Sequence, residues 1–297
     1  MIYLLYGSDD YRLSQKLNEI VSQSIERIDL FESDEKIFWN YLNQGILFAS
    51  KKNLVIENAF SNLVFKKSFS KKAQELSLSE HVLIFVEKKE IKPTDSFFKI
   101  LKENGKTQEF LLLSGKKLED WVKNLFSQFG SHITDKALQN LLECTLGDMW
   151  TLSNEIQKLV TFKNDITEKE VALLVKPNIE IEIFKTVDGL VAKNKKQALT
   201  ALQKYLDSGE NLFKLLSMIA YQMRTLLMIK IAQSSGNFLA KDLGIHPYVF
   251  KKLTDVTRNI SLEQLKIATQ SIFLADLKRK TGQESPEQTV RSLILSI

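Results

Sequence analysis

The first part of the chain alternates short apolar runs with longer polar stretches. Five apolar runs have the length and composition of buried strands: residues 2–6, 26–31, 53–57, 82–86 and 109–113. The polar stretches between them are long enough for helices, among them residues 11–24, 34–44 and 62–77. This alternation predicts a parallel sheet with helices on both faces, ending near Ser114-Gly115.

The pattern changes to a helical period after Gly115. Apolar residues recur every three or four positions at Leu118, Trp121, Val122, Leu125, Phe126 and Phe129. Further helices are predicted after Thr134-Asp135, with Leu138, Leu141 and Leu142 facing inward, and from about Asp148, with Leu152, Ile156 and Leu159 inward. Thr167 and Glu170 form a capping box for a short fourth helix, and Pro177 closes this small helical region.

Residues 178–297 show only helical periods. Ser261 with Gln264, and Ser285-Pro286 with Gln288, are signatures of helix starts. Residues 212–232 are apolar enough to predict a helix that is buried on most sides. The expected fold class is therefore α/β plus all-α, in three domains: 1–115 with a parallel sheet, 116–177 as a small helical domain and 178–297 as a helical bundle.

Composition is that of an ordinary soluble protein with a sizeable core. The chain has 297 residues, 44% of them hydrophobic and 26% charged. The lone Cys144 excludes an internal disulfide and suggests the cytoplasm. With three histidines and no C-x-x-C there is no zinc ribbon, and neither metal nor cofactor is expected. The longest apolar runs are too short for a membrane span, and no secretion signal precedes the first one.

The net charge of +5 is unevenly distributed. Residues 178–297 hold 17 Lys+Arg against 11 Asp+Glu, so the basic excess belongs to the C-terminal part. Such a balance permits contact with a polyanion, although a solvated helical surface also explains it.

Residues 1–14 have the outline of a phosphate-binding loop without its chemistry. An apolar run leads into Gly7, as a strand leads into the G-x-x-x-x-G-K-[ST] loop. Where that pattern requires its second glycine and its lysine, the chain has Arg12 and Leu13, and only Ser14 fits. Leu13 can supply neither the close backbone N–H cradle nor the positive charge that holds the phosphates.

No other group of residues predicts catalysis. Glu57 is followed by Asn58 where an ATPase of this type carries an acid pair, and the next strand ends in Glu87-Lys88-Lys89, again without a pair. Cys144 lies within a helical stretch, where a buried structural thiol is expected rather than a nucleophile. His81, His132 and His246 are scattered along the chain.

The segment Gly45-Ile46-Leu47-Phe48-Ala49-Ser50 allows two interpretations. Its Leu-Phe pair follows an amphipathic stretch and precedes two lysines and a strand. The pair could pack under the sheet, or it could present two large apolar anchors to a partner. Each anchor of that size would contribute roughly 1.5–3 kcal/mol on burial.

Together, these features resemble the delta subunit family of bacterial DNA polymerase III, the clamp-opening subunits of sliding-clamp loaders in the AAA+ superfamily. The resemblance rests on MIYLLYGSDDY at the start, GILFASKKNLVIENA at 45–59, LGIHPYVFKKL at 243–253 and LADLKRKTG at 274–282. It implies an AAA+-like α/β domain with a degenerate P-loop, a helical lid and a C-terminal helical collar.

The resemblance also implies a function and partners. Leu47 and Phe48, with Ile46 beside them, match the Leu-Phe pair that the family inserts into a hydrophobic pocket of the ring-shaped clamp. The expected partners are the beta sliding clamp, the ATPase (tau/gamma) and delta-prime subunits of the loader, and primed DNA within the complex. The chain would be a non-catalytic part of a nucleotidyltransferase complex, because related subunits hydrolyse the ATP.

Two other functions stay open on the sequence: a divergent P-loop ATPase, and a stand-alone nucleic-acid-binding protein that uses the basic C-terminal bundle. A possible DNA contact lies after Pro247, where Tyr248 and Phe250 stand beside Lys251 and Lys252. An aromatic ring next to cations suits stacking on a base near a phosphate. The alternative is that both rings belong to the core and the lysines are solvated.

Overall fold

In the computed structural model, the apolar runs of the first half of the chain form one parallel sheet. Its strand order is β2-β3-β4-β1-β5, with bounds β1 Ile2–Tyr6, β2 Glu26–Asp29, β3 Asn53–Glu57, β4 Val82–Glu87 and β5 Lys106–Glu109. The structure describes the whole chain except residues 22–24, 32–33, 44–52, 192–193, 208, 210–211, 236–239, 259 and 297.

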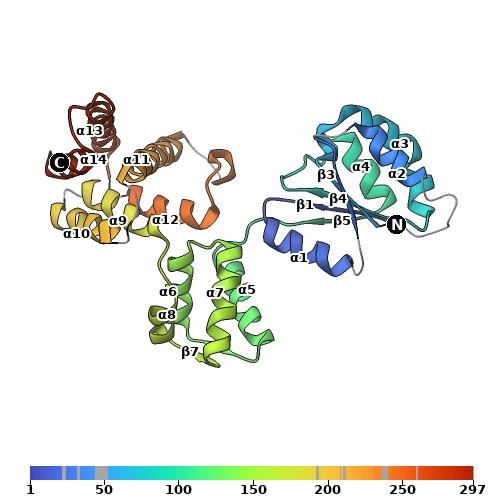
Figure 1. Cartoon of the computed structure of the whole chain (residues 1–297), viewed down its shortest axis with the longest axis horizontal. Helices are drawn as coiled ribbons and strands as arrows, with labels where there is room; N and C mark the ends of the chain where they lie inside the picture. Colours follow the sequence, from blue (N-terminus) through green and yellow to red (C-terminus); the bar gives the residue numbers. More distant parts are fainter. Residues whose placement is uncertain are drawn as a thin grey trace. The chain divides into compact units, whose positions relative to one another are not determined.

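Helices cover both faces of the sheet, as predicted (Figure 1). Because side chains alternate along a strand, Ile2, Leu4 and Tyr6 of β1 face one layer while Leu5 faces the other. The first layer contains the helices α2 Glu35–Asn43, α3 Leu63–Leu78 and α4 Ser96–Asn104, and the second contains α1 Asp10–Ile20. The first layer is rich in phenylalanine, with Phe65, Phe69, Phe85 and Phe97 in edge and tilted ring contacts.

The prediction of a strand at residues 109–113 is wrong. The strand β5 lies earlier, at Lys106–Glu109, and its residues are largely exposed or half-buried. It is an edge strand paired only with β1 among the described strands, so its sequence is polar. The apolar run that follows crosses the end of β1 instead: the Phe110 N–H donates to Tyr6 O at 2.7 Å, and the ring of Phe110 is buried against α1.

The next residues form short helices around a two-stranded parallel pairing that the sequence did not predict. The helices are α5 Lys116–Gln128, α6 Asp135–Thr145, α7 Met149–Phe162 and α8 Glu168–Leu174, and the strands are β6 His132–Ile133 and β7 Asp165–Ile166. The predicted caps Thr134, Asp148 and the Thr167–Glu170 capping box are present. Phe129 departs from the prediction, because α5 ends before it and its side chain is exposed.

Every element in the remaining described part of the chain is a helix, with bounds α9 Ile179–Val191, α10 Lys195–Asp207, α11 Leu212–Ser235, η2 Ala240–Leu243, α12 Pro247–Arg258, α13 Leu262–Lys280 and α14 Pro286–Ser296. Both predicted helix starts, at Ser261 and Ser285, show the reciprocal hydrogen bonds of a capping box. These helices enclose one apolar core.

Helix α11 is long and apolar enough to cross a membrane by length and composition, and it is the single such candidate among the described residues. Half of that apolar stretch is buried inside the protein, and α11 packs against α9, α12, α13 and α14. Its composition is therefore that of the central helix of a bundle.

The chain divides into two compact units, Met1–Leu113 and Ser114–Ile297. The boundary between them lies two residues before the predicted end of the α/β domain. The further boundary predicted between 177 and 178 falls inside the second unit and stays a prediction.

Candidate functional site

The turn after β1 is too short for a phosphate-binding loop. Only Gly7, Ser8 and Asp9 separate the strand from α1. Gly7 has φ +135°, and a Cβ placed there would lie 2.1 Å from Phe110 O. Gly7 is thus required by a close backbone crossing, and its N–H donates to Glu87 O at 3.0 Å.

Asp9 occupies the N-terminus of α1. Its buried carboxylate accepts the backbone N–H of Arg12 at 3.0 Å and the Arg12 Nε–H at 2.6 Å. The guanidinium of Arg12 also donates to the carbonyl oxygen of Leu111. A helix N-terminus attracts anions, and here the anion is supplied by the chain itself. The Asp9–Arg12 pair therefore stands where a phosphate would be held.

Leu13 and Ser14 complete the degenerate loop within α1. Leu13, at the position of the P-loop lysine, is 1% exposed and packs with Leu5, Val55 and Ile84 against the sheet. Ser14 is half-buried on the same helix. A lysine at position 13 would point its ammonium group into an apolar layer, where an unpaired charge is unfavourable.

The carboxylates at the ends of β3 and β4 make structural contacts. Glu87 accepts the Phe60 N–H at 2.9 Å and lies 3.5 Å from Lys89 Nζ, and burial raises the pKa of its carboxyl. Glu57 pairs with Arg27 at 3.4 Å. Asn58, with φ +58°, donates to Asp29 at 2.9 Å. In the part of the chain that the structure describes, no cluster of three or more His, Cys, Asp or Glu could hold a metal ion.

Cys144 lies near the end of α6 and is half-buried. Burial, followed by the nearby Glu143, raises the pKa of its thiol. A raised pKa disfavours the thiolate, so the surroundings of Cys144 do not activate it as a nucleophile.

The residues Ile46, Leu47 and Phe48 lie outside the described residues. The segment that contains them joins the end of α2 at Asn43 to the start of β3 at Asn53. Both interpretations of the Leu-Phe pair, packed under the sheet or exposed to a partner, therefore stay predictions.

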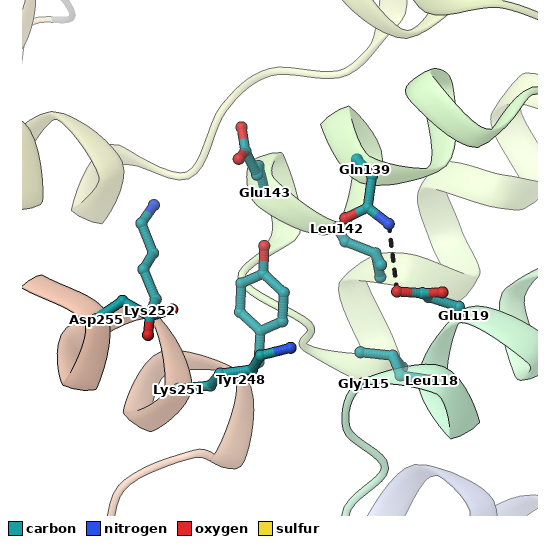
Figure 2. Close-up of a pocket in the computed structure, with 10 residues that line it drawn as sticks. All are labelled: Gly115, Leu118, Glu119, Gln139, Leu142, Glu143, Tyr248, Lys251, Lys252 and Asp255. Atoms are coloured by element: carbon teal, nitrogen blue, oxygen red, sulfur yellow. Dashed lines mark hydrogen bonds between the residues drawn. The ribbon is translucent and has the colours of Figure 1, made fainter.

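Tyr248, Lys251 and Lys252 come together at one pocket of about 230 Å³ in the second unit (Figure 2). They belong to α12, and the facing wall is formed by α5 and α6. Figure 2 shows the Tyr248 hydroxyl pointing toward Glu143. Burial, with smaller contributions from Glu143 and Cys144, raises the pKa of Tyr248 to about 12.

The pocket is not a uniformly basic surface. Its lining includes the carboxylates of Glu119, Glu143 and Asp255 as well as the two lysines. Lys252 Nζ lies 5.5 Å from the centre of the Phe184 ring, and Phe250 packs against the bundle core. The sequence pattern located the aromatic and basic residues, but Glu119 and Glu143 come from helices more than a hundred positions earlier. Only the fold reveals them.

The comparisons of this chain with known proteins point to the same kind of protein. Residues 180–297 match the family described as DNA polymerase III delta subunit, C-terminal domain. DNA polymerase III subunit delta of Bacillus subtilis is 24% identical, over 100% of this chain and 92% of the relative. The probable DNA polymerase III subunit delta of Aquifex aeolicus is also 24% identical, over 99% of this chain and 90% of that protein.

A solved structure shares the fold. The Bacillus subtilis DNA clamp loader delta protein superposes with a TM-score of 0.79 at 22% identity, covering 99% of this chain and 94% of that one. The predicted fold class, α/β with a parallel sheet followed by helical regions, is confirmed. The C-terminal residues thus match a delta-subunit domain, and over its whole length the chain is similar to delta subunits of bacterial DNA polymerase III.

Proposed function

We propose that the chain is the non-catalytic, clamp-opening subunit of a sliding-clamp loader that acts on primed DNA during replication in the cytoplasm. The similarity to DNA polymerase III delta subunits supports the role in that polymerase. The solved structure that shares the fold is a DNA clamp loader delta protein, which supports the link to clamp loading.

The structure at the start of α1 is the observation that supports a non-catalytic role. An ATPase needs a free helix N-terminus and a lysine for the β- and γ-phosphates. In this chain the N-terminus is capped by Asp9, which Arg12 neutralises, and Leu13 is buried. The ATPase (tau/gamma) subunits of the loader would bind and hydrolyse ATP in its place.

We assign clamp binding to Ile46, Leu47 and Phe48. Two large apolar side chains between a helix and a strand can fill a hydrophobic pocket on the clamp, which gives a compact interface centre. If the wedge binds the open ring more tightly than the closed ring, binding shifts the clamp toward the open state. Residues 178–297 would hold this subunit beside the ATPase and delta-prime subunits.

A double substitution tests the wedge. Replacing Leu47 and Phe48 by Ala should cost about 3–6 kcal/mol of clamp binding, hence at least about a hundredfold in affinity, because most of the apolar area is lost. The melting temperature should not change. Clamp affinity is measured by surface plasmon resonance and stability by differential scanning calorimetry.

The matched control is Leu63→Ala with Val64→Ala. These two side chains are an adjacent apolar pair at the start of α3, 69% and 62% exposed, so they control for loss of surface hydrophobicity. The control should bind the clamp normally. If the Leu47/Phe48 variant were destabilised yet bound the clamp with native affinity, the pair would belong to the core and the wedge would be refuted.

A further inference from the structure

Helices α9 and α10 form a groove lined by hydrogen-bond donors. The groove has a volume of about 310 Å³, and its polar lining consists of Lys185, Asn194, Lys196, Gln197, Thr200 and Lys204. Among the residues that the structure describes, no carboxylate lines it, in contrast to the mixed pocket beside Tyr248. A cavity with three cationic side chains and no anionic one has the chemistry of a site for anions.

The two helices that form the groove are held at a fixed spacing. A Cβ on Gly189 would lie 2.7 Å from the backbone nitrogen of Ala198, so α9 and α10 pack backbone against backbone. The Asn194 N–H, just before α10, donates to Gly189 O of α9 at 2.8 Å. The Asn194 side chain caps the start of α10 by accepting the Gln197 N–H at 3.1 Å. The lysines therefore extend from a rigid base.

The cations on α10 are arranged in a line. Lys196, Thr200 and Lys204 are four residues apart and share one face of the helix. At 1.5 Å per residue, Lys196 and Lys204 are about 12 Å apart along the axis. Each strand of a nucleic acid carries one negative charge per roughly 3.4 Å of axis, so this span covers about three to four phosphates. Neither lysine forms an ion pair with the described residues.

We propose that this groove binds the sugar–phosphate backbone of DNA through Lys185, Lys196 and Lys204. The choice of DNA over an acidic protein segment follows from the lining, which offers point charges and amides but neither arginine forks nor an apolar pocket for a side chain. The basic excess of residues 178–297 would steer the same polyanion. The choice of ligand rests on the proposed function, in which primed DNA passes through the loader.

The test compares two charge-matched variants of the full chain. The groove variant carries Lys196→Gln and Lys204→Gln. The control variant carries Lys266→Gln and Lys280→Gln, two exposed lysines of α13 outside the groove. Binding of a labelled single-stranded oligonucleotide is followed by fluorescence anisotropy at several salt concentrations.

For the groove variant, the slope of log K against log salt should become shallower by about 1.4, since each lost phosphate contact on a single strand removes about 0.7. The control should keep the native slope. Equal loss in both variants would show diffuse electrostatics and overturn the proposal, as would failure of the native chain to bind DNA at low salt.

Clamp binding by the groove variant separates this inference from the proposed function. Native clamp affinity together with an unchanged DNA slope would reject the groove alone. Loss of binding to the other loader subunits, with the DNA slope preserved, would show that the groove takes an acidic protein surface and would also reject the proposal.

Discussion

Gly7 occupies a position where a larger residue would disturb the backbone of this fold. It has φ +135° and lies under the backbone of Phe110, at the crossing that joins the end of β1 to the chain after β5. Replacing it with Ala combines backbone strain with a steric clash against a carbonyl group, which cannot move without breaking the bond from Asp9 N–H to Phe110 O.

We expect Gly7→Ala to lower the free energy of unfolding by about 3 kcal/mol or more, measured by urea denaturation. The matched control is Gly130→Ala. Gly130 has φ +68° with no atom within 4 Å of the added Cβ, so it carries only the conformational penalty of about 1 kcal/mol. Equal effects in the two variants would disprove the crowding at Gly7.

The pKa of the Asp188 carboxyl on α9 predicts that the stability of the protein depends on pH. Burial raises the pKa of its carboxyl from 3.8 to about 6, and the nearby Lys252 only partly opposes this. Because the folded state holds the proton more tightly than the unfolded state, the group lowers stability as pH rises from about 4 through 6.

Asp188→Asn should therefore stabilise the protein at pH 7 by roughly 2–3 kcal/mol and have little effect at pH 4. Thermal denaturation at both pH values measures this. Asp207→Asn, at an exposed site on α10, controls for the loss of one negative charge. A gain of the same size at both pH values would contradict the assigned pKa.

Among the helices and strands, α1 bears on ATP binding, because its N-terminus corresponds to the end of a P-loop. We expect no ATP binding by isothermal titration calorimetry, since Asp9 caps the helix and Arg12 is engaged with it. A micromolar affinity would revive the divergent ATPase.

Leu13→Lys sharpens this test. If only the lysine were missing, the substitution would create binding. Since Leu13 is buried against the sheet, we expect instead a loss of several kcal/mol of stability and still no binding.

At the scale of the whole chain, we expect residues 178–297, whose helices supply most of one apolar core, to mediate assembly into the loader. A chain ending at Lys176 should fail to enter the complex in size-exclusion chromatography. Leu146 packs into that core, so circular dichroism must first show that the truncated chain is folded. Normal assembly of a folded truncated chain would refute the assignment.

Local patterns predicted much of the secondary structure. The buried strands β1, β3 and β4 and the capped helices α6, α7, α8 and α13 were found from apolar runs and cap residues. Their signals are short-range: a strand buried on both faces must be continuously apolar, and a cap residue bonds three positions ahead. The resemblance to the delta subunits likewise rested on short sequence blocks.

Contacts between distant segments required the structure. β5 was misplaced because an edge strand may be polar, and its place is set by pairing with β1, a hundred residues earlier. The same applies to the contact of Arg12 with Leu111 and to Glu119 and Glu143 beside Tyr248. The lysine groove likewise depends on how α9 packs against α10. A local pattern encodes which surface each element buries, whereas the charges that meet across a site depend on how the elements pack.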